Sequence, residues 1–94
     1  MSEFKLDGNN LRNHSGSKIA YIDGNAIRDH HGSKVATIDG RYIRDPHGSK
    51  LAEFDGEHIR DSHGSRIGTL KDVEKVIDGH GGISLVALWL LFIR

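Results

Sequence analysis

The feature that most constrains this chain is a sixteen-residue block that occurs four times without a gap, from Asp7 to Leu70. Its consensus is Asp-Gly-x-x-Ile-Arg-Asp-x-His-Gly-Ser-Lys-Ile-Ala-x-Ile, and the copies begin at Asp7, Asp23, Asp39 and Asp55. A fixed period is the signature of a repeat architecture, in which every copy forms the same small supersecondary unit. The period therefore limits the fold more than any single motif does.

Each block contains two turn signals. The Asp-Gly pair lies between apolar runs and predicts a tight hairpin of type I′, because that turn needs positive φ, which glycine adopts without steric cost. The second signal is a longer loop, such as residues 29–33, whose glycine is placed for a left-handed residue. Two short strands per block, separated by these turns, predict an all-β array.

Three apolar columns recur, and each receives one residue from every copy. The first is Leu11, Ile27, Ile43 and Ile59, the second is Ile19, Val35, Leu51 and Ile67, and the third is Ile22, Ile38, Phe54 and Leu70. Alternation along a strand places the second and third columns on opposite faces, which suits hairpins packed around a shared axis. The first and last copies resemble the middle ones, unlike solenoid caps. We therefore predict a mainly β fold, with nine short strands and four tandem hairpins over residues 3–70 in a closed, fourfold pseudo-symmetric array.

After Leu70 the period ends. Val73, Val76 and Ile77 have the i, i+3, i+4 spacing of an amphipathic helix, which we expect over residues 71–79 as part of a single domain, 1–94.

A glycine-rich break then leads into an apolar C-terminal segment, residues 83–94, whose first eleven positions include one polar residue. Periodicity does not separate helix from strand in a run that is apolar all round, so both remain open. The run is shorter than the about 20 apolar residues that span a membrane, and it lacks the polar face of an interfacial anchor.

We therefore expect this tail to be buried in protein, where it completes the core of its own chain or of a partner copy. An exposed apolar patch of this size is rare in soluble monomers, so we expect the glycine-rich break to let the tail reach outward and part of the burial to lie between chains. A symmetric dimer is the commonest closed oligomer. The expected interaction residues are Leu85, Leu88, Trp89 and Phe92.

The repeat and the tail together resemble the bacterial 4-fold beta flower domain. The likeness rests on the four tandem blocks, the stretch Gly-Ile-Ser-Leu-Val-Ala-Leu-Trp at 82–89 and the terminal Phe-Ile-Arg, so it extends over residues 4–94. It implies a fourfold pseudo-symmetric β array with a C-terminal element, and it implies no activity. Residues 59–70 are also similar, over a shorter pattern, to the D-x-x-G-x-x-I-G core of PRC-barrel domains, which are small β-barrels used for docking.

Charge and composition exclude several classes of protein. The chain has 13 basic and 13 acidic residues, and a net charge of zero argues against nucleic-acid and anionic membrane partners and favours self-association. Without cysteine it has no disulfide framework and no thiolate metal site. The N-terminus lacks a signal-peptide pattern, so we expect a cytoplasmic protein.

The repeated histidines and arginines are the candidate ligand-binding residues. They are Arg12, Arg28, Arg44, Arg60, His31, His47 and His63. In a symmetric array, imidazoles that meet at one point bind zinc, and a ring of guanidinium groups holds phosphate or carboxylate. Alternatively, each histidine is a polar turn residue, and each arginine pairs with the recurring aspartates and turn carbonyls. No carboxylate or thiolate stands at metal-ligand spacing beside the histidines, so we predict no metal and no cofactor.

No catalytic constellation is present, because the Gly-Ser turns lack the strand-to-helix G-x-S-x-G context of a nucleophile and the chain repeats one set of residues four times. We expect a non-enzymatic structural or protein-interaction module that self-associates or docks to a protein partner. Two alternatives remain: an anion- or small-ligand-binding protein that uses the fourfold arginine and histidine positions, and a membrane-peripheral protein anchored by its tail.

Overall fold

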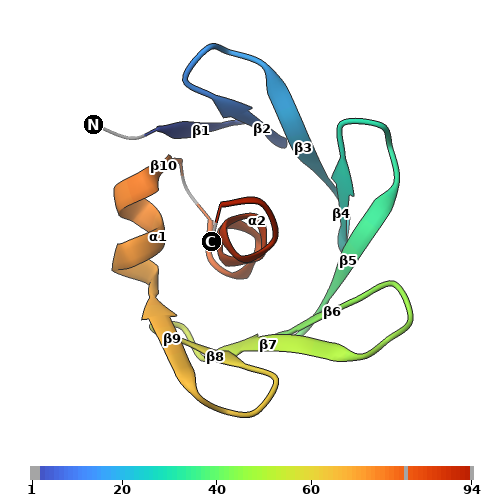
Figure 1. Cartoon of the computed structure of the whole chain (residues 1–94), viewed down its shortest axis with the longest axis vertical. Coiled ribbons are helices and arrows are strands. Elements are labelled where there is room, and N and C mark those ends of the chain that lie inside the picture. Colours follow the sequence, from blue (N-terminus) through green and yellow to red (C-terminus); the bar gives the residue numbers. More distant parts are fainter. Residues whose placement is uncertain (1–2, 80, 94) are drawn as a thin grey trace.

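A computed structural model describes residues 3–79 and 81–93, and in this part of the chain ten strands form one sheet that curves around a central helix (Figure 1). The strands are β1 (Phe4–Asp7), β2 (Asn10–Asn13), β3 (Lys18–Asp23), β4 (Ala26–Asp29), β5 (Lys34–Asp39), β6 (Tyr42–Arg44), β7 (Lys50–Phe54), β8 (His58–Asp61), β9 (Arg66–Thr69) and β10 (Ile77–Asp78). The helices are α1 (Leu70–Val76) and α2 (Ile83–Phe92).

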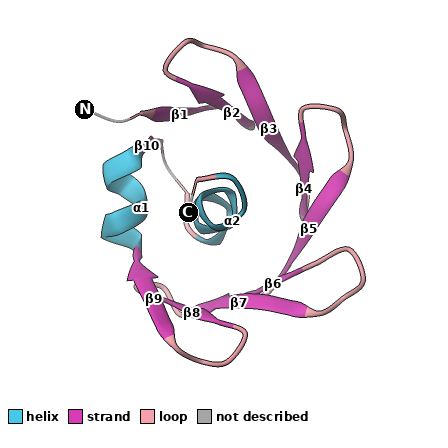
Figure 2. Ribbon diagram, in the orientation of Figure 1, coloured by secondary structure: helices cyan, strands magenta, loops and turns pink. Residues whose placement is uncertain are grey.

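Neighbouring strands from β1 to β9 pair antiparallel in chain order. The loops that join β2 to β3, β4 to β5, β6 to β7 and β8 to β9 project outward from the ring, and we call these four two-stranded units petals 1 to 4 (Figure 2). Every petal has a register shift just before its arginine, as between Ile27 and Arg28 in petal 2. A bulge bends and twists a strand, so the sheet curves by the same device in each copy.

The Asp-Gly turns connect one petal to the next. Gly24 and Gly40 have φ values of +61° and +62°, so the prediction of positive φ at these glycines is confirmed. Among the described residues, however, only glycines have positive φ, so Asn25 and Arg41 do not. A type I′ turn needs positive φ at both central residues, and our type I′ assignment is therefore wrong. Positive φ at the first central residue alone is the pattern of a type II′ turn.

Helix α2 lies at the centre of the ring, where Leu85, Val86, Ala87 and Leu88 have no exposed surface (Figure 1). The four side chains of the first apolar column are equally buried, and so are three small residues of the adjacent strands, Ala20, Ala36 and Ala52. A helix that packs against protein all around its axis has no need of a polar face, which explains why Ser84 is its single polar residue. The tail is thus a helix in the core of its own chain. Our expectation that the glycine-rich break lets it reach outward is wrong.

Petal 4 departs from the repeat in order to accommodate this helix. Its residue at the small inward position is Gly68 instead of alanine, and a Cβ there would lie 3.2 Å from Cη2 of Trp89 and 3.5 Å from Oδ2 of Asp72. These distances leave little room for a methyl group. The missing methyl group makes space for the indole ring.

The sheet is not closed, which corrects the predicted closed fourfold array. Its end strands, β9 and β10, are not paired with each other, and α1 lies between them (Figure 1). The predicted helix over 71–79 is also shorter at its C-terminal end, because Ile77 leaves α1 to pair with Phe4 in the parallel β10–β1 ladder and is 1% exposed. Asp72 defines the start of α1, since its Oδ2 accepts the N–H of Thr69 at 3.0 Å.

Candidate functional site

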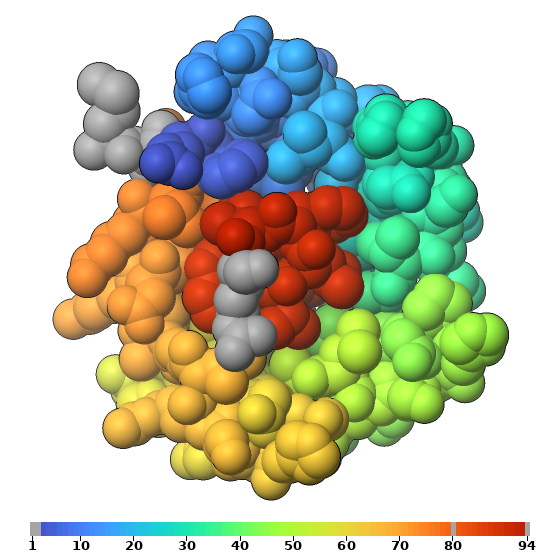
Figure 3. Space-filling view, in the orientation of Figure 1, coloured from blue at the N-terminus to red at the C-terminus, as the bar shows by residue number. Residues whose placement is uncertain are grey.

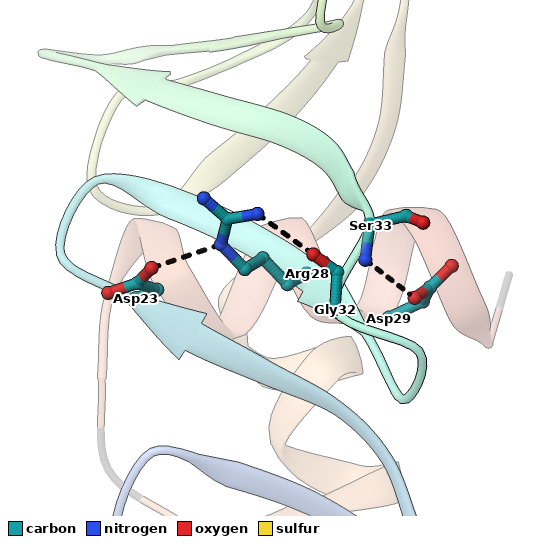
Figure 4. Close-up of polar contacts among 5 residues, drawn as sticks. All are labelled: Asp23, Arg28, Asp29, Gly32 and Ser33. Atoms are coloured by element: carbon teal, nitrogen blue, oxygen red, sulfur yellow. Dashed lines mark hydrogen bonds and ion pairs between the residues drawn. The ribbon is translucent and has the colours of Figure 1, made fainter.

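The repeated arginine links the two turns of its own copy. In petal 2, Arg28 Nε donates to Oδ2 of Asp23 at 3.0 Å, and Nη1 donates to the carbonyl oxygen of Gly32 at 2.8 Å (Figure 4). Asp23 belongs to the Asp-Gly turn before β4, and Gly32 belongs to the loop after it. Arg28 therefore holds both ends of β4 in place, which supports the structural interpretation of this residue.

Petal 3 has the same two bonds, whereas the contact between arginine and turn aspartate is longer or absent among the described residues of petals 1 and 4. Arg44 Nε lies 3.0 Å from Asp39 Oδ2, whereas Arg12 Nε lies 3.5 Å from Asp7 Oδ2. Arg60 keeps the bond to the loop carbonyl, at 3.2 Å, and in the described part of the chain no ion pair joins it to the turn aspartate of its copy. The four copies are thus equivalent in fold and unequal in the bonding of their arginines.

The turn aspartate of petal 4 has a different role. Oδ1 of Asp55 accepts the backbone N–H groups of Glu57 and His58 at 3.0 and 2.8 Å. The bond from His58 and then the bond from Glu57 lower the pKa of Asp55 from its ordinary value of 3.8. Desolvation raises this pKa, and the nearby charges of His58 and Arg60 lower it further. Asp55 thus stabilises its own turn through Oδ1, and Arg60 acts on it through its charge without a salt bridge within the described residues.

The loop at the tip of each petal is held by the residue after the arginine. In petal 2, Oδ1 of Asp29 accepts the N–H groups of His31 and Ser33 at 2.9 and 3.1 Å. Desolvation raises the pKa of this carboxyl, but the bonds from Ser33 and His31 and the nearby rings of His31 and His30 outweigh it, so the pKa falls below 3.8. Asn13 makes the same two bonds in petal 1 with an uncharged amide.

The structure does not bring the predicted ligand-binding residues together. His31, His47 and His63 are exposed in three separate outward loops, and among the described residues no group of three His, Cys, Asp or Glu side chains is placed to hold a metal ion. Each arginine donates to the carbonyl oxygen of the loop that follows its own strand, and α2 occupies the axis around which a ring of guanidinium groups would converge (Figure 1). The predicted arginines and histidines therefore do not form a ligand site on a fourfold axis.

A groove that sequence reasoning missed lies where β10, β1 and β2 adjoin. It has a volume of about 700 Å³, and the charged and polar side chains that line it include Lys5, Asp7, Arg12, Asn13, His14 and Asp78. The signal for it was partly in the sequence, because pairing residues 4–6 with the next strand sets Lys5 opposite Arg12. The contribution of Asp78 was not visible, since it depends on the two-residue strand β10.

A comparison with models of protein families shows to which family the chain belongs. The model of a family described as 5-fold beta-flower protein matches residues 2–86. The chain belongs to the 5-fold beta-flower family. The resemblance to a beta-flower is thus confirmed, but the family is described as fivefold and not fourfold. This family model is not that of the PRC-barrel domains. Searches of curated proteins and of solved structures gave no match.

The ring of this beta-flower contains a part that does not carry the sequence repeat. Four petals carry the sixteen-residue repeat, and α1 with β10 occupies the remaining part of the ring between petal 4 and β1 (Figure 1). The sequence of this last sector does not repeat the block. A count of sequence copies therefore gives four, and α1 with β10 extends the ring without adding a copy.

The predicted interaction residues divide into two groups in the beta-flower. Leu85 and Leu88 have no exposed surface and pack in the core of their own chain, so they offer no surface to a partner in this fold. Trp89 and Phe92 are partly exposed, as are the neighbouring residues 90, 91 and 93. Part of α2 is uncovered at the centre of one face of the molecule (Figure 3). In the described chain, neither helix has the length and apolar character needed to cross a membrane.

Proposed function

We propose that this beta-flower is a non-catalytic interaction module that forms a symmetric dimer through the face on which α2 ends. The observation that supports the proposal is the partly exposed apolar last turn of α2, formed by residues 89–92 at the centre of that face (Figure 3). Burial of apolar surface is the main driving force of protein association. A second copy offers a surface of the same chemistry.

Two further properties favour a second copy as the occupant. The formal net charge is zero, so two chains meet without long-range repulsion. A twofold axis through this face places each helix end against its counterpart, and twofold interfaces of this self-complementary kind are the commonest among oligomers. The membrane-anchor alternative is less well supported, because α2 would have to leave the core that it fills.

Sedimentation velocity at tens of micromolar tests the proposal with a single surface substitution. Leu91→Lys places a charge on the partly exposed last turn, and Ile83→Lys places the same charge at the other end of α2, where the native side chain is also partly exposed. We expect a dimer for the native chain and for Ile83→Lys, and a folded monomer for Leu91→Lys, with circular dichroism as the check on folding.

A monomeric native chain would overturn the proposal, and so would a folded Leu91→Lys variant that remains dimeric. Truncation after Gly82 is a poorer test, because it also removes Leu85 and Leu88 from the core. The surface substitutions separate association from folding.

A further inference from the structure

The tip loop of petal 3 contains the single proline of the chain, and this proline follows an aspartate. Asp45 precedes Pro46, whereas petals 2 and 4 have a histidine and a serine after the corresponding aspartate. The backbone N–H groups of that histidine, His30, and of that serine, Ser62, make no hydrogen bond within the described residues. Proline, which lacks this N–H and is favoured early in a turn, therefore fits the loop without changing it.

The loop fixes both the side chain and the main-chain carbonyl group of Asp45. Its Oδ1 accepts the N–H groups of His47 and Ser49, each at 2.9 Å, and its main-chain oxygen accepts the N–H of Gly48 at 3.0 Å. The N–H of Asp45 in turn donates to the main-chain oxygen of Ser49 at 2.8 Å. Both acyl groups of this residue thus face the same short run of backbone N–H donors, while Oδ2 makes no bond within the described residues.

An aspartyl–prolyl bond breaks without a protease when the aspartate attacks its own main-chain carbonyl. A side-chain carboxyl oxygen of Asp45 bonds to the carbonyl carbon of the same residue and forms a cyclic anhydride. The bond from that carbon to the nitrogen of Pro46 breaks, and the carboxyl proton passes to this nitrogen, which leaves as a secondary amine. Water then opens the anhydride to two carboxyl groups. The net change is the hydrolysis of one peptide bond by one water molecule.

Two of the contacts in the loop favour this step. The N–H of Gly48 lies on the oxygen that gains negative charge as the ring closes, at the distance expected of an oxyanion donor. A side chain that is already held in place loses less freedom in reaching the reacting geometry. Petal 2 has the same carbonyl contact, from Gly32 to Asp29 at 3.0 Å, but a secondary amide follows its aspartate. The tertiary nitrogen of proline is the more basic one, and it accepts the proton and leaves more readily.

We propose that petal 3 cleaves its own chain between Asp45 and Pro46. The reaction is a single turnover within the chain and requires no pocket for a substrate, so it is independent of the dimer face at the end of α2. Strands β6 and β7 stay in the ring through their pairing with β5 and β8. The product is therefore a beta-flower in which fragments 1–45 and 46–94 remain associated and petal 3 ends in two new termini.

Intact-mass spectrometry of the purified chain, held in mildly acidic buffer, tests the proposal. We expect fragments 1–45 and 46–94, whose summed mass exceeds that of the chain by one water, and their co-elution in native size-exclusion chromatography. The same chain in urea at the same pH gives the ordinary acid lability of the bond. The folded chain should cleave at least about tenfold faster, because one aligned donor on a developing oxyanion changes such rates by about 10²–10³.

Three variants locate the reaction, with circular dichroism as the check on folding. Pro46→Ser gives petal 3 the residue of petal 4, and Asp45→Asn removes the carboxyl while keeping an Oδ1 acceptor, as Asn13 does in petal 1. Both variants should stay intact. His30→Pro builds the same bond in petal 2, where Asp29 has the same loop contacts, and should add a cut after Asp29.

A native chain that stays intact in mildly acidic buffer overturns the proposal. Cleavage that is no faster in the folded chain than in urea overturns it too, since such cleavage is ordinary acid hydrolysis. Cleavage of Asp45→Asn at the native rate would exclude the carboxyl as the nucleophile. A folded His30→Pro variant that is not cut after Asp29 would show that the loop contacts do not promote the reaction, and it would refute the proposal as well.

Discussion

The petals and the C-terminal helix of this beta-flower are stabilised in different ways. A petal is held by hydrogen bonds within one sixteen-residue copy, as when Arg28 joins Asp23 to Gly32 and Asp29 closes its own loop (Figure 4). Helix α2 has almost no polar side chain, and its buried face contacts segments that are distant in sequence. The petals therefore determine the local shape of the ring, whereas α2 supplies the centre of the core, against which the buried residues of the strands pack.

This difference also explains which residues vary between copies. Inward positions follow the helix, so that Gly68 replaces alanine only where Trp89 packs. Outward positions are free of that constraint, and there the copies differ in charge, as Asn13 shows where the other copies have an aspartate.

The largest expected effect comes from the core. Leu88→Ala removes a fully buried side chain of α2 and should lower the free energy of unfolding by about 2–5 kcal/mol, because a cavity remains among the surrounding petals. Leu91→Ala, in the partly exposed last turn, is the matched control and should cost about 1 kcal/mol or less. Urea denaturation measures both, and a loss at Leu88 no larger than that at Leu91 would show that the buried middle of α2 contributes no more to stability than its partly exposed last turn.

A smaller effect is expected at the turns between petals. Gly24→Ala and Gly40→Ala should each destabilise the fold by about 1–2 kcal/mol, because both glycines have φ near +60° and a Cβ is unfavourable there. A Cβ at either position would have no atom beyond the adjacent residues within 4 Å, so the loss reports backbone strain alone. Unchanged melting temperatures in both variants would contradict the turn geometry.

The arginines test how nearly equivalent the petals are. Arg28→Ala and Arg44→Ala should each cost about 0.5–1 kcal/mol, since each removes a partly exposed ion pair and one bond to a loop carbonyl. Arg60→Ala should cost less, because its bond to the loop carbonyl is not accompanied by an ion pair with the turn aspartate in the described part of the chain. Chemical denaturation of the three variants gives the order, and a loss at Arg60 as large as at Arg28 would refute this ranking.

The smallest expected effect is in the dependence of stability on pH. The folded-state pKa of Asp29 is lowered, so its contribution is complete above its ordinary pKa of 3.8 and is lost as the pH falls through the lowered value. Asp29→Asn keeps the acceptor for the loop N–H groups, as Asn13 does, and removes the titration. The variant should therefore lose less melting temperature than the native chain between about pH 5 and pH 3. An unchanged slope would show that this carboxylate does not couple to folding.

The sequence predicted the petals well because their structure is local. The apolar column at Leu11 and Ile27, the glycines with positive φ and the arginine bonds all depend on residues within one copy. Closure of the ring was predicted wrongly because it depends on α1 and on β10, whose two residues leave no periodic signal. Whether the tail is helix or strand could not be decided from a run that is apolar all round, since only its position inside the ring distinguishes them.

For the candidate sites too, the sequence predicted local features and missed those that depend on distant segments. The sequence identified the repeated arginines and histidines. It did not show that these residues lie apart, because the axis of the ring is occupied by α2. The groove at Lys5 and Arg12 depends on pairing between β1, β2 and the distant β10, and only part of that pairing could be inferred.

Native-state hydrogen exchange tests most directly the claim that α2 is the core around which the petals fold. Amides in the middle of α2, such as those of Val86 and Leu88, should exchange with the same free energy as the slowest amides of the inner strands, near Ala20 and Ala36, because neither region opens without the other. Protected petals together with α2 amides that exchange at a clearly lower free energy would contradict the account, since they would show a ring that is stable without its central helix.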